Sequence, residues 1–196
     1  KALADLYRKK DLVRVRGALK EHLGLMALAS DRMKPFWSMA LLTETLMRND
    51  SALVLDEAVQ ARARAAGQAV SGLESMQEQL TAIDAIPLED QAAMLLEMVR
   101  NDLHRGSIER MMDAYARQDL DALQAVVREG GMPSSMDAAL LAERNARMAG
   151  RMAYRLNAGC SCFFAIGAAH LPGAGGVLVS LQGLGFTLSP VAVERP

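Results

Sequence analysis

Residues 156–170 read LNAGCSCFFAIGAAH, and this stretch decides which fold the sequence predicts. It opens a segment of 38 residues, Leu156 to Val193, that contains no Asp, Glu, Lys or Arg. An uncharged segment of this length is long enough to raise the question of a membrane span. Pro172, several polar residues and repeated glycines interrupt it, so we interpret it as buried strand, turn, helix and strand.

The order of elements within this segment follows from its changes of periodicity. Residues 161–166 (SCFFAI) predict a strand, and residues 173–184 predict a short packed helix. Residues 186–193 predict a second strand, which Pro190 places at an edge because proline cannot donate to a ladder. We expect the strand over 161–166 to be covered on both sides, since it carries no charge.

The rest of the chain predicts helices with one further strand. The sequence indicates helices over 11–23, 31–48, 56–66, 136–157, two between 87 and 116, and one after Asp119. A short strand at 68–73 ends next to Ser75 and Glu78, whose spacing is that of a capping box. The expected fold class is therefore α+β, a helix-rich single domain over residues 1–196 with a small mixed β-sheet.

Composition excludes several classes of protein. Hydrophobic residues make up 51% of the chain, charged residues 23%, and the net charge is −1. These values exclude a disordered chain and give no support to general nucleic-acid binding. The side chains of the two cysteines, Cys160 and Cys162, would lie on one face of an extended segment but too far apart to form a disulfide with each other. Two thiols also do not make a zinc site by themselves.

His170 is the first candidate site residue. It follows an apolar predicted strand and precedes Pro172 and a glycine-rich helix start. Ligands of mixed α/β proteins bind at strand ends, where loops and free backbone N–H groups converge. A buried histidine with a structural role is an equally good interpretation of the same residue.

Glu74 is the parallel candidate, at the end of the predicted strand 68–73. The capping box puts its carboxylate beside a helix N-terminus, where negative charge is favoured, and this can be its whole role. If the two strands are parallel neighbours, Glu74 and His170 lie at the same end of the sheet. Together they would supply a pair of metal ligands, or a base and a polarising group.

The predicted long helix carries arginines three to four residues apart, at positions 144, 147, 151 and 155. A row of this kind is usually a solvated face. The functional alternative is that Arg144 reaches the site to hold a carboxylate or an oxyanion, for which a guanidinium is well suited. Asn145 beside it can assist.

Three stretches together make the sequence recognisable. They are the run AGQAVSGLES at residues 66–75 with EQL at 78–80, Glu143-Arg144-Asn145, and FFAIGAAHL at residues 163–171. Lys34-Pro35-Phe36-Trp37 adds a fourth match. In this order and spacing they resemble the TraB/GumN family of bacterial proteins, to which the TIKI-type metalloproteases also look related.

The resemblance implies a fold like that of erythromycin-esterase-like and ChaN-like proteins, and the activity of a metal-dependent hydrolase, peptidase-like or esterase-like. Glu74 and His170 match two of the family's three metal-site positions, and Arg144 matches a polar residue of the same pocket. A divalent metal ion and a peptide or small-molecule substrate are therefore implied. So is a periplasmic or membrane-associated location, although residues 1–196 predict no transmembrane segment.

Three departures from the family pattern qualify what we expect of the chain. The family's first Gly-x-x-His motif is absent, so we expect residues 1–196 to lack an N-terminal strand, to bind metal weakly and to hydrolyse little. An uncovered sheet edge would favour a homo-oligomer. Gln68 and Ala169 stand where the family has lysine and glycine. The alternatives are a non-catalytic binding or regulatory module on the same fold, and a helical interaction module unrelated to the family.

Overall fold

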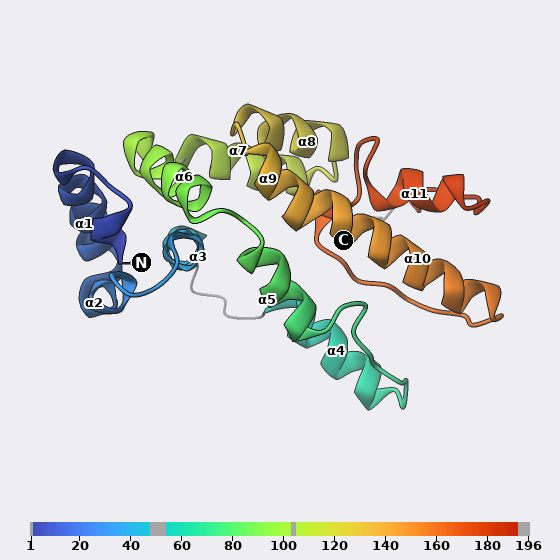
Figure 1. The fold of residues 1–196 in the computed structure, drawn as a ribbon. Helices are drawn as coiled ribbons and strands as arrows, with labels where there is room; N and C mark the ends of the chain where they lie inside the picture. The colour runs from blue at the N-terminus through green and yellow to red at the C-terminus, as the bar shows by residue number, and fades with distance from the viewer. Residues whose placement is uncertain (1, 48–53, 103–104, 192–196) are drawn as a thin grey trace.

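The computed structural model describes residues 2–47, 54–102 and 105–191, and in these ranges the fold is built of helices (Figure 1). The longer helices are α1 (Lys9–Leu23), α3 (Pro35–Met47), α4 (Leu55–Ala65), α5 (Met76–Asp84), α6 (Leu88–Arg100), α7 (Arg105–Ala116), α8 (Leu120–Glu129) and α10 (Glu143–Asn157). The shorter helices are α2 (Ala27–Ser30), α9 (Ser134–Asp137) and α11 (Val177–Gly183). A π-helical turn over Ala138–Ala142 joins α9 to α10, and a 3-10 turn covers Ala168–His170.

The predicted α+β class with a small mixed sheet is wrong, because the described residues contain no strand. Residues 68–73, 161–166 and 186–191 are neither helical nor joined in a ladder, and positions 192–193 of the last predicted strand lie outside the described residues. A β-like sequence becomes a strand only when another segment takes its backbone hydrogen bonds. These three segments instead lay their apolar side chains on helices, so the described fold is all-α.

The helix predictions are largely confirmed. α4 stops before Gly67, whose φ of 70° is the left-handed conformation that favours glycine after a helix. Asp119 caps α8 by accepting a hydrogen bond from the Ala122 backbone N–H at 2.9 Å. The helix predicted over 31–48 starts only at Pro35, and its last residue, Arg48, lies outside the described residues.

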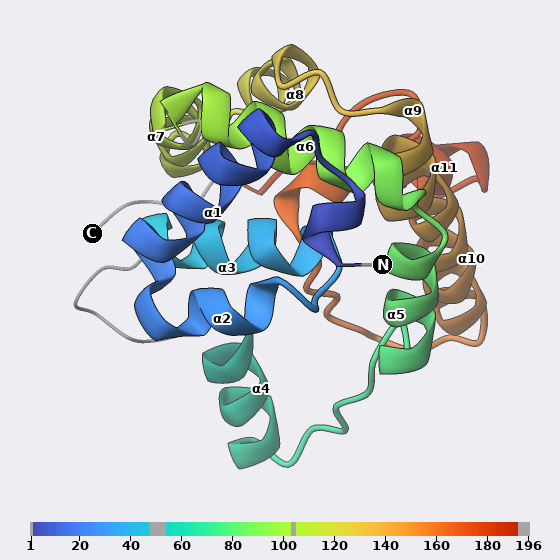
Figure 2. The same cartoon turned by 60° about the vertical axis from the view of Figure 1, so that its left-hand side comes forward.

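The best-buried part of the molecule is a cluster that we call the N-terminal core, between α1, α3 and α6 (Figure 2). Its members are all almost inaccessible to solvent: Leu3, Val15, Leu19, Leu42, Leu95 and Met98. The fully buried Gln91 side chain fastens the neighbouring turns. It accepts a hydrogen bond from Phe36 N at 3.2 Å and donates to Ile86 O at 2.9 Å.

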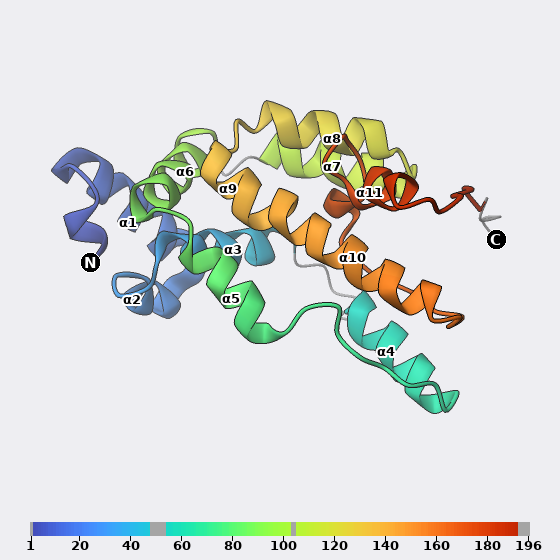
Figure 3. The ribbon, with the colours of Figure 1, turned by 45° about the vertical axis from the view of Figure 1, so that its right-hand side comes forward.

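A second cluster, which we call the C-terminal layer, forms where α10 packs against α11 (Figure 3). Its buried members are Met148, Ala149, Met152, Val177 and Leu181. The half-buried residues packed on it come from the three segments that were predicted as strands: Leu73, Phe164, Ile166, Phe186 and Leu188. This layer holds the predicted site residues in place.

The charge-free segment that raised the membrane question does not form one long helix. Across the described residues, no helix is both long enough and apolar enough to span a bilayer.

Candidate functional site

Glu74 is positioned by the start of α5. The predicted capping box is confirmed: Ser75 Oγ accepts a hydrogen bond from Glu78 N at 3.2 Å, and Ser75 N donates to Glu78 Oε2 at 2.8 Å. This reciprocal pair fixes the chain direction at the first turn. The residue just before it, Glu74, is therefore directed towards α10.

The Glu74 carboxylate is buried in an ion pair with Arg144. Arg144 Nε donates to both carboxylate oxygens, at 3.2 and 3.0 Å, and Nη2 donates to Oε2 at 2.7 Å. The side chains are only 4% and 20% exposed. Burial by itself would raise the pKa of Glu74, but the hydrogen bonds and charge of Arg144, and then of Arg147, outweigh it and lower the pKa. Glu74 is thus a fixed anion.

The other arginines of α10 explain the row seen in the sequence. Arg147 Nη2 lies 3.5 Å from Glu74 Oε1, and Arg151 binds both Leu73 O and the Glu78 carboxylate. The Arg151 guanidinium and the Ser75 backbone N–H hold the pKa of Glu78 at about 2. Three of the four arginines therefore fasten α10 to the start of α5 rather than forming a solvated face.

His170 lies in a 3-10 turn and is oriented by α10. Its Nδ1 is 2.6 Å from Oδ1 of Asn145, a residue that is only 4% exposed. Burial, followed by the charge of Arg144, lowers the pKa of His170, while the Glu74 charge partly opposes the shift. At neutral pH the imidazole is therefore uncharged.

The loop that carries His170 is held on α10 by close backbone approach. Asn145 Nδ2 donates to Gly175 O at 2.8 Å. A Cβ atom on Gly176 would lie 2.3 Å from both Leu171 O and Pro172 O, so the chain needs a glycine there. This agrees with the interpretation of these glycines as close-packing residues.

The structure brings the sequence-predicted residues together, but through α10 and not at the end of a sheet. Glu74 contacts Arg144 directly, and His170 reaches the neighbouring Asn145. Arg147 and Arg151 were not singled out as individual site residues. A signal for them was present, because Glu74 and Glu78 are four residues apart, as are Arg147 and Arg151.

The donor set of this arrangement does not fit a divalent metal ion. Both Glu74 oxygens are taken by Arg144, and a second guanidinium adjoins one of them. Two positive charges at the carboxylate oppose a dication. Within the described ranges no group of three or more His, Cys, Asp and Glu side chains could hold a metal. Nε2 of His170 is the ligand atom that this geometry leaves free.

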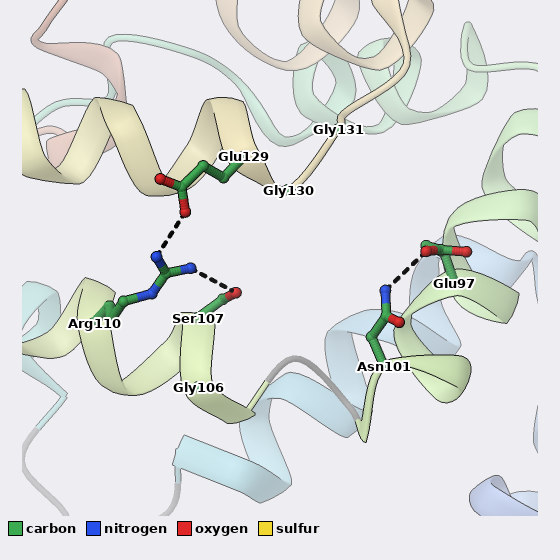
Figure 4. A pocket seen from close by; sticks show the side chains of 8 residues that line it. All are labelled: Glu97, Asn101, Gly106, Ser107, Arg110, Glu129, Gly130 and Gly131. Atoms are coloured by element: carbon green, nitrogen blue, oxygen red, sulfur yellow. Dashed lines mark hydrogen bonds and ion pairs between the residues drawn. The ribbon is translucent and has the colours of Figure 1, made fainter.

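Two of the cavities in the described part of the molecule bear on the search for a site. One of about 260 Å³ lies beside the start of α5 and is lined by Ser75, Glu143 and Arg147, among others, but not by Glu74, Arg144 or His170. A larger one, of about 820 Å³, lies where the end of α6, the start of α7 and the end of α8 meet (Figure 4). Its polar groups bind each other, as in the Arg110–Glu129 ion pair, and none of the predicted site residues lines it.

Comparison with known proteins gives one informative match. No curated protein and no solved structure matches the sequence. The model of the TraB/PrgY/gumN family matches residues 1–190, which include every residue of the arrangement described above. Because this match spans nearly the whole chain, the protein belongs to the TraB/PrgY/gumN family.

Proposed function

We propose that the centre formed by Glu74, Arg144 and His170 is a hydrolytic site acting on an amide or ester bond of a peptide or small molecule. The observation that carries this proposal is the Asn145–His170 hydrogen bond, at 2.6 Å, which orients a neutral imidazole. A neutral, oriented histidine is the commonest general base of hydrolytic enzymes.

The hydrogen bonds of Asn145 support one tautomer of His170. Because the amide nitrogen of Asn145 donates to Gly175 O, its oxygen is the atom that faces the imidazole. An amide oxygen only accepts, so Nδ1 of His170 carries the proton and Nε2 presents a lone pair. Nε2 would then accept the proton of an attacking water, and Asn145 is a positioning residue.

The arginines would supply positive charge for the oxyanion that forms during attack. Arg144 binds Glu74 through Nε and Nη2, whereas among the described residues Arg147 makes one 3.5 Å contact, to Glu74 Oε1, and its buried Nε has no hydrogen-bond partner. Arg147 also lines the cavity of about 260 Å³. Positive charge fixed beside the reacting carbonyl stabilises negative charge as it develops.

A metal-dependent form of this hydrolase places further requirements on the chain. Glu74 would have to exchange Arg144 for the cation, and at least one ligand besides Glu74 and His170 would be needed. Without a metal, a general base contributes about 10²–10⁴-fold to the rate, so slow turnover of activated substrates is expected.

A non-catalytic binding or regulatory module is the second candidate. It is favoured by the contacts of Glu74. Both carboxylate oxygens accept hydrogen bonds from Arg144, so the ion pair holds the start of α5 on α10. In this case Asn145 and His170 only hold the loop of residues 167–176 on α10.

The test is hydrolysis of chromogenic esters and peptide amides, with chelator and with added divalent metals. His170→Ala should lower the rate about 10²-fold, and Asn145→Ala should lower it less and shift the pH profile. His22→Ala, which removes a histidine from α1, is the matched control and should change nothing. Hydrolysis that His170→Ala leaves intact would exclude this site, and folded protein without any hydrolysis would favour the binding module.

A further inference from the structure

The region around α1 carries a surplus of positive charge. Residues 8–24, which include the whole of α1, contain six Lys and Arg but only two acidic residues, in a chain whose net charge is −1. Val15 and Leu19 are buried in the N-terminal core, so the cations lie on the other faces of the helix. Five of the six are exposed and form no ion pair with a described residue: Arg8, Lys9, Lys10, Arg14 and Lys20.

The spacing of residues in α1 gathers several of these cations on one face. Helical side chains three or four residues apart lie side by side. By this rule, five exposed positions share a face opposite the core: Lys10, Val13, Arg14, Gly17 and Lys20. Val13, near the middle of this face, is 66% exposed. Glu21 is the one acidic residue of α1 on the same face, since Asp11 pairs with Arg100.

Exposed apolar side chains follow directly after this basic face. α1 ends at Gly24, and a 3-10 turn over Gly24–Met26 leads into α2. Leu25 is 88% exposed, Met26 57% and Leu28 79%. α2 packs beside α1, and Figure 2 shows both helices at the front of the view. The cations and the apolar side chains are therefore neighbours on one surface.

This surface lies at the end of the molecule away from α10 and α11 (Figure 1). α1 and α2 pack on the N-terminal core, whereas the three extended segments pack on the C-terminal layer. A further strand would pair with extended segments, because only these offer a backbone ladder. The exposure of the basic face therefore does not depend on such a strand.

We propose that α1 and α2 dock on the surface of an anionic lipid bilayer, with the cations of α1 against the headgroup phosphates and Leu25, Met26 and Leu28 inserted below them. Anionic lipids attract Lys and Arg held near the surface. Apolar side chains beside those cations gain free energy by leaving water for the interface. A nucleic acid would neutralise the same cations but would leave the three apolar side chains in water. This inference is independent of the hydrolytic site.

Co-sedimentation with lipid vesicles tests the docking. The chain should bind vesicles of phosphatidylcholine mixed with phosphatidylglycerol, and about 1 M salt should weaken this binding. It should not bind vesicles of phosphatidylcholine alone. Lys10→Gln with Arg14→Gln should weaken binding about twentyfold without lowering the thermal midpoint, because both side chains are exposed. The matched control is Arg62→Gln with Arg155→Gln, which removes two exposed arginines of α4 and α10 and should leave binding unchanged.

Tryptophan fluorescence tests the insertion of the apolar side chains. When the Leu25→Trp variant binds anionic vesicles, the emission of the added indole should shift to shorter wavelength, measured against wild type because Trp37 is present in both. Leu184→Trp, at an exposed leucine after α11, should show no shift.

Four results would overturn the proposal. They are no binding to anionic vesicles, equal binding by wild type and the variant of Lys10 and Arg14, unchanged emission from vesicle-bound Leu25→Trp, and binding of double-stranded DNA as tight as that of anionic vesicles.

Discussion

The N-terminal core and the C-terminal layer are built from the same kinds of residues but differ in how completely these residues are buried. In the N-terminal core, helices cover each other and four leucine and valine side chains are fully inaccessible: Leu3, Val15, Leu42 and Leu95. In the C-terminal layer, two helices are covered by extended segments whose other side faces solvent, as the exposed Phe163 shows. Helices form their backbone hydrogen bonds internally, so side-chain packing alone is enough to bury a core between helices. An extended segment has no internal backbone hydrogen bonds, so its backbone groups are satisfied only when another segment or solvent binds them.

Truncation in the N-terminal core should have the largest effect. Leu95→Ala removes a fully buried side chain from α6 and should lower the free energy of unfolding by about 3–5 kcal/mol. Urea denaturation measures the change. Leu28→Ala, on the exposed side of α2, should stay within about 0.5 kcal/mol. If the two losses were equal, the core would not be where the structure has it.

Breaking the ion pair between Glu74 and Arg144, which fastens the C-terminal layer, should have the second-largest effect on the free energy of unfolding. Glu74→Gln keeps the shape but leaves the guanidinium of Arg144 without its anion, which should cost about 1–3 kcal/mol. Glu129→Gln, at an ion pair with both side chains more than half exposed, should cost under about 1 kcal/mol. A Glu74 variant as stable as wild type would show that α10 and α5 are held by something else.

Substitutions in the extended segment over residues 161–166 should lower the free energy of unfolding less than either of these two changes. Residues 161–166 were expected to be covered on both sides, but Ile166 is only half-buried, so Ile166→Ala should cost about 1–2 kcal/mol. Phe163→Ala, on the exposed side, should cost about 0.5 kcal/mol or less under the same conditions. Equal losses would mean that both faces are covered, as for a strand inside a sheet.

The smallest effect expected is on pH dependence. The pKa of His170 lies below its unfolded value of about 6.5, so the unfolded chain binds more protons just below that pH. The stability that depends on neutral His170 is complete above about pH 6.5 and decreases as the pH falls. Unfolding measured between pH 5 and pH 7 should show this slope, and His170→Gln should remove it while His22→Gln should not.

Helix ends, the capping box and the candidate residues were predictable from the sequence because each depends on neighbours along the chain. Ser75 finds Glu78 three residues away, and Gly67 is needed wherever a helix must stop. The approach of Glu74 to Arg144 was inferred from a sheet that the described residues do not form. It arises because α10 lies against the start of α5, where Arg144 and Arg147 pair with Glu74 and Arg151 pairs with Glu78.

The sequence by itself determined which segments are helical, which are extended and apolar, and which few residues carry chemistry, since periodicity, caps and charge are local properties. The tertiary structure alone decided whether residues 161–166 become a strand, because a strand needs hydrogen-bond partners from a distant segment. The tertiary structure also decided the protonation and the orientation of His170. Burial and the charge of Arg144 lower the pKa of the imidazole, and the contact with Asn145 orients it; none of these can be deduced from the residues beside His170 in the chain.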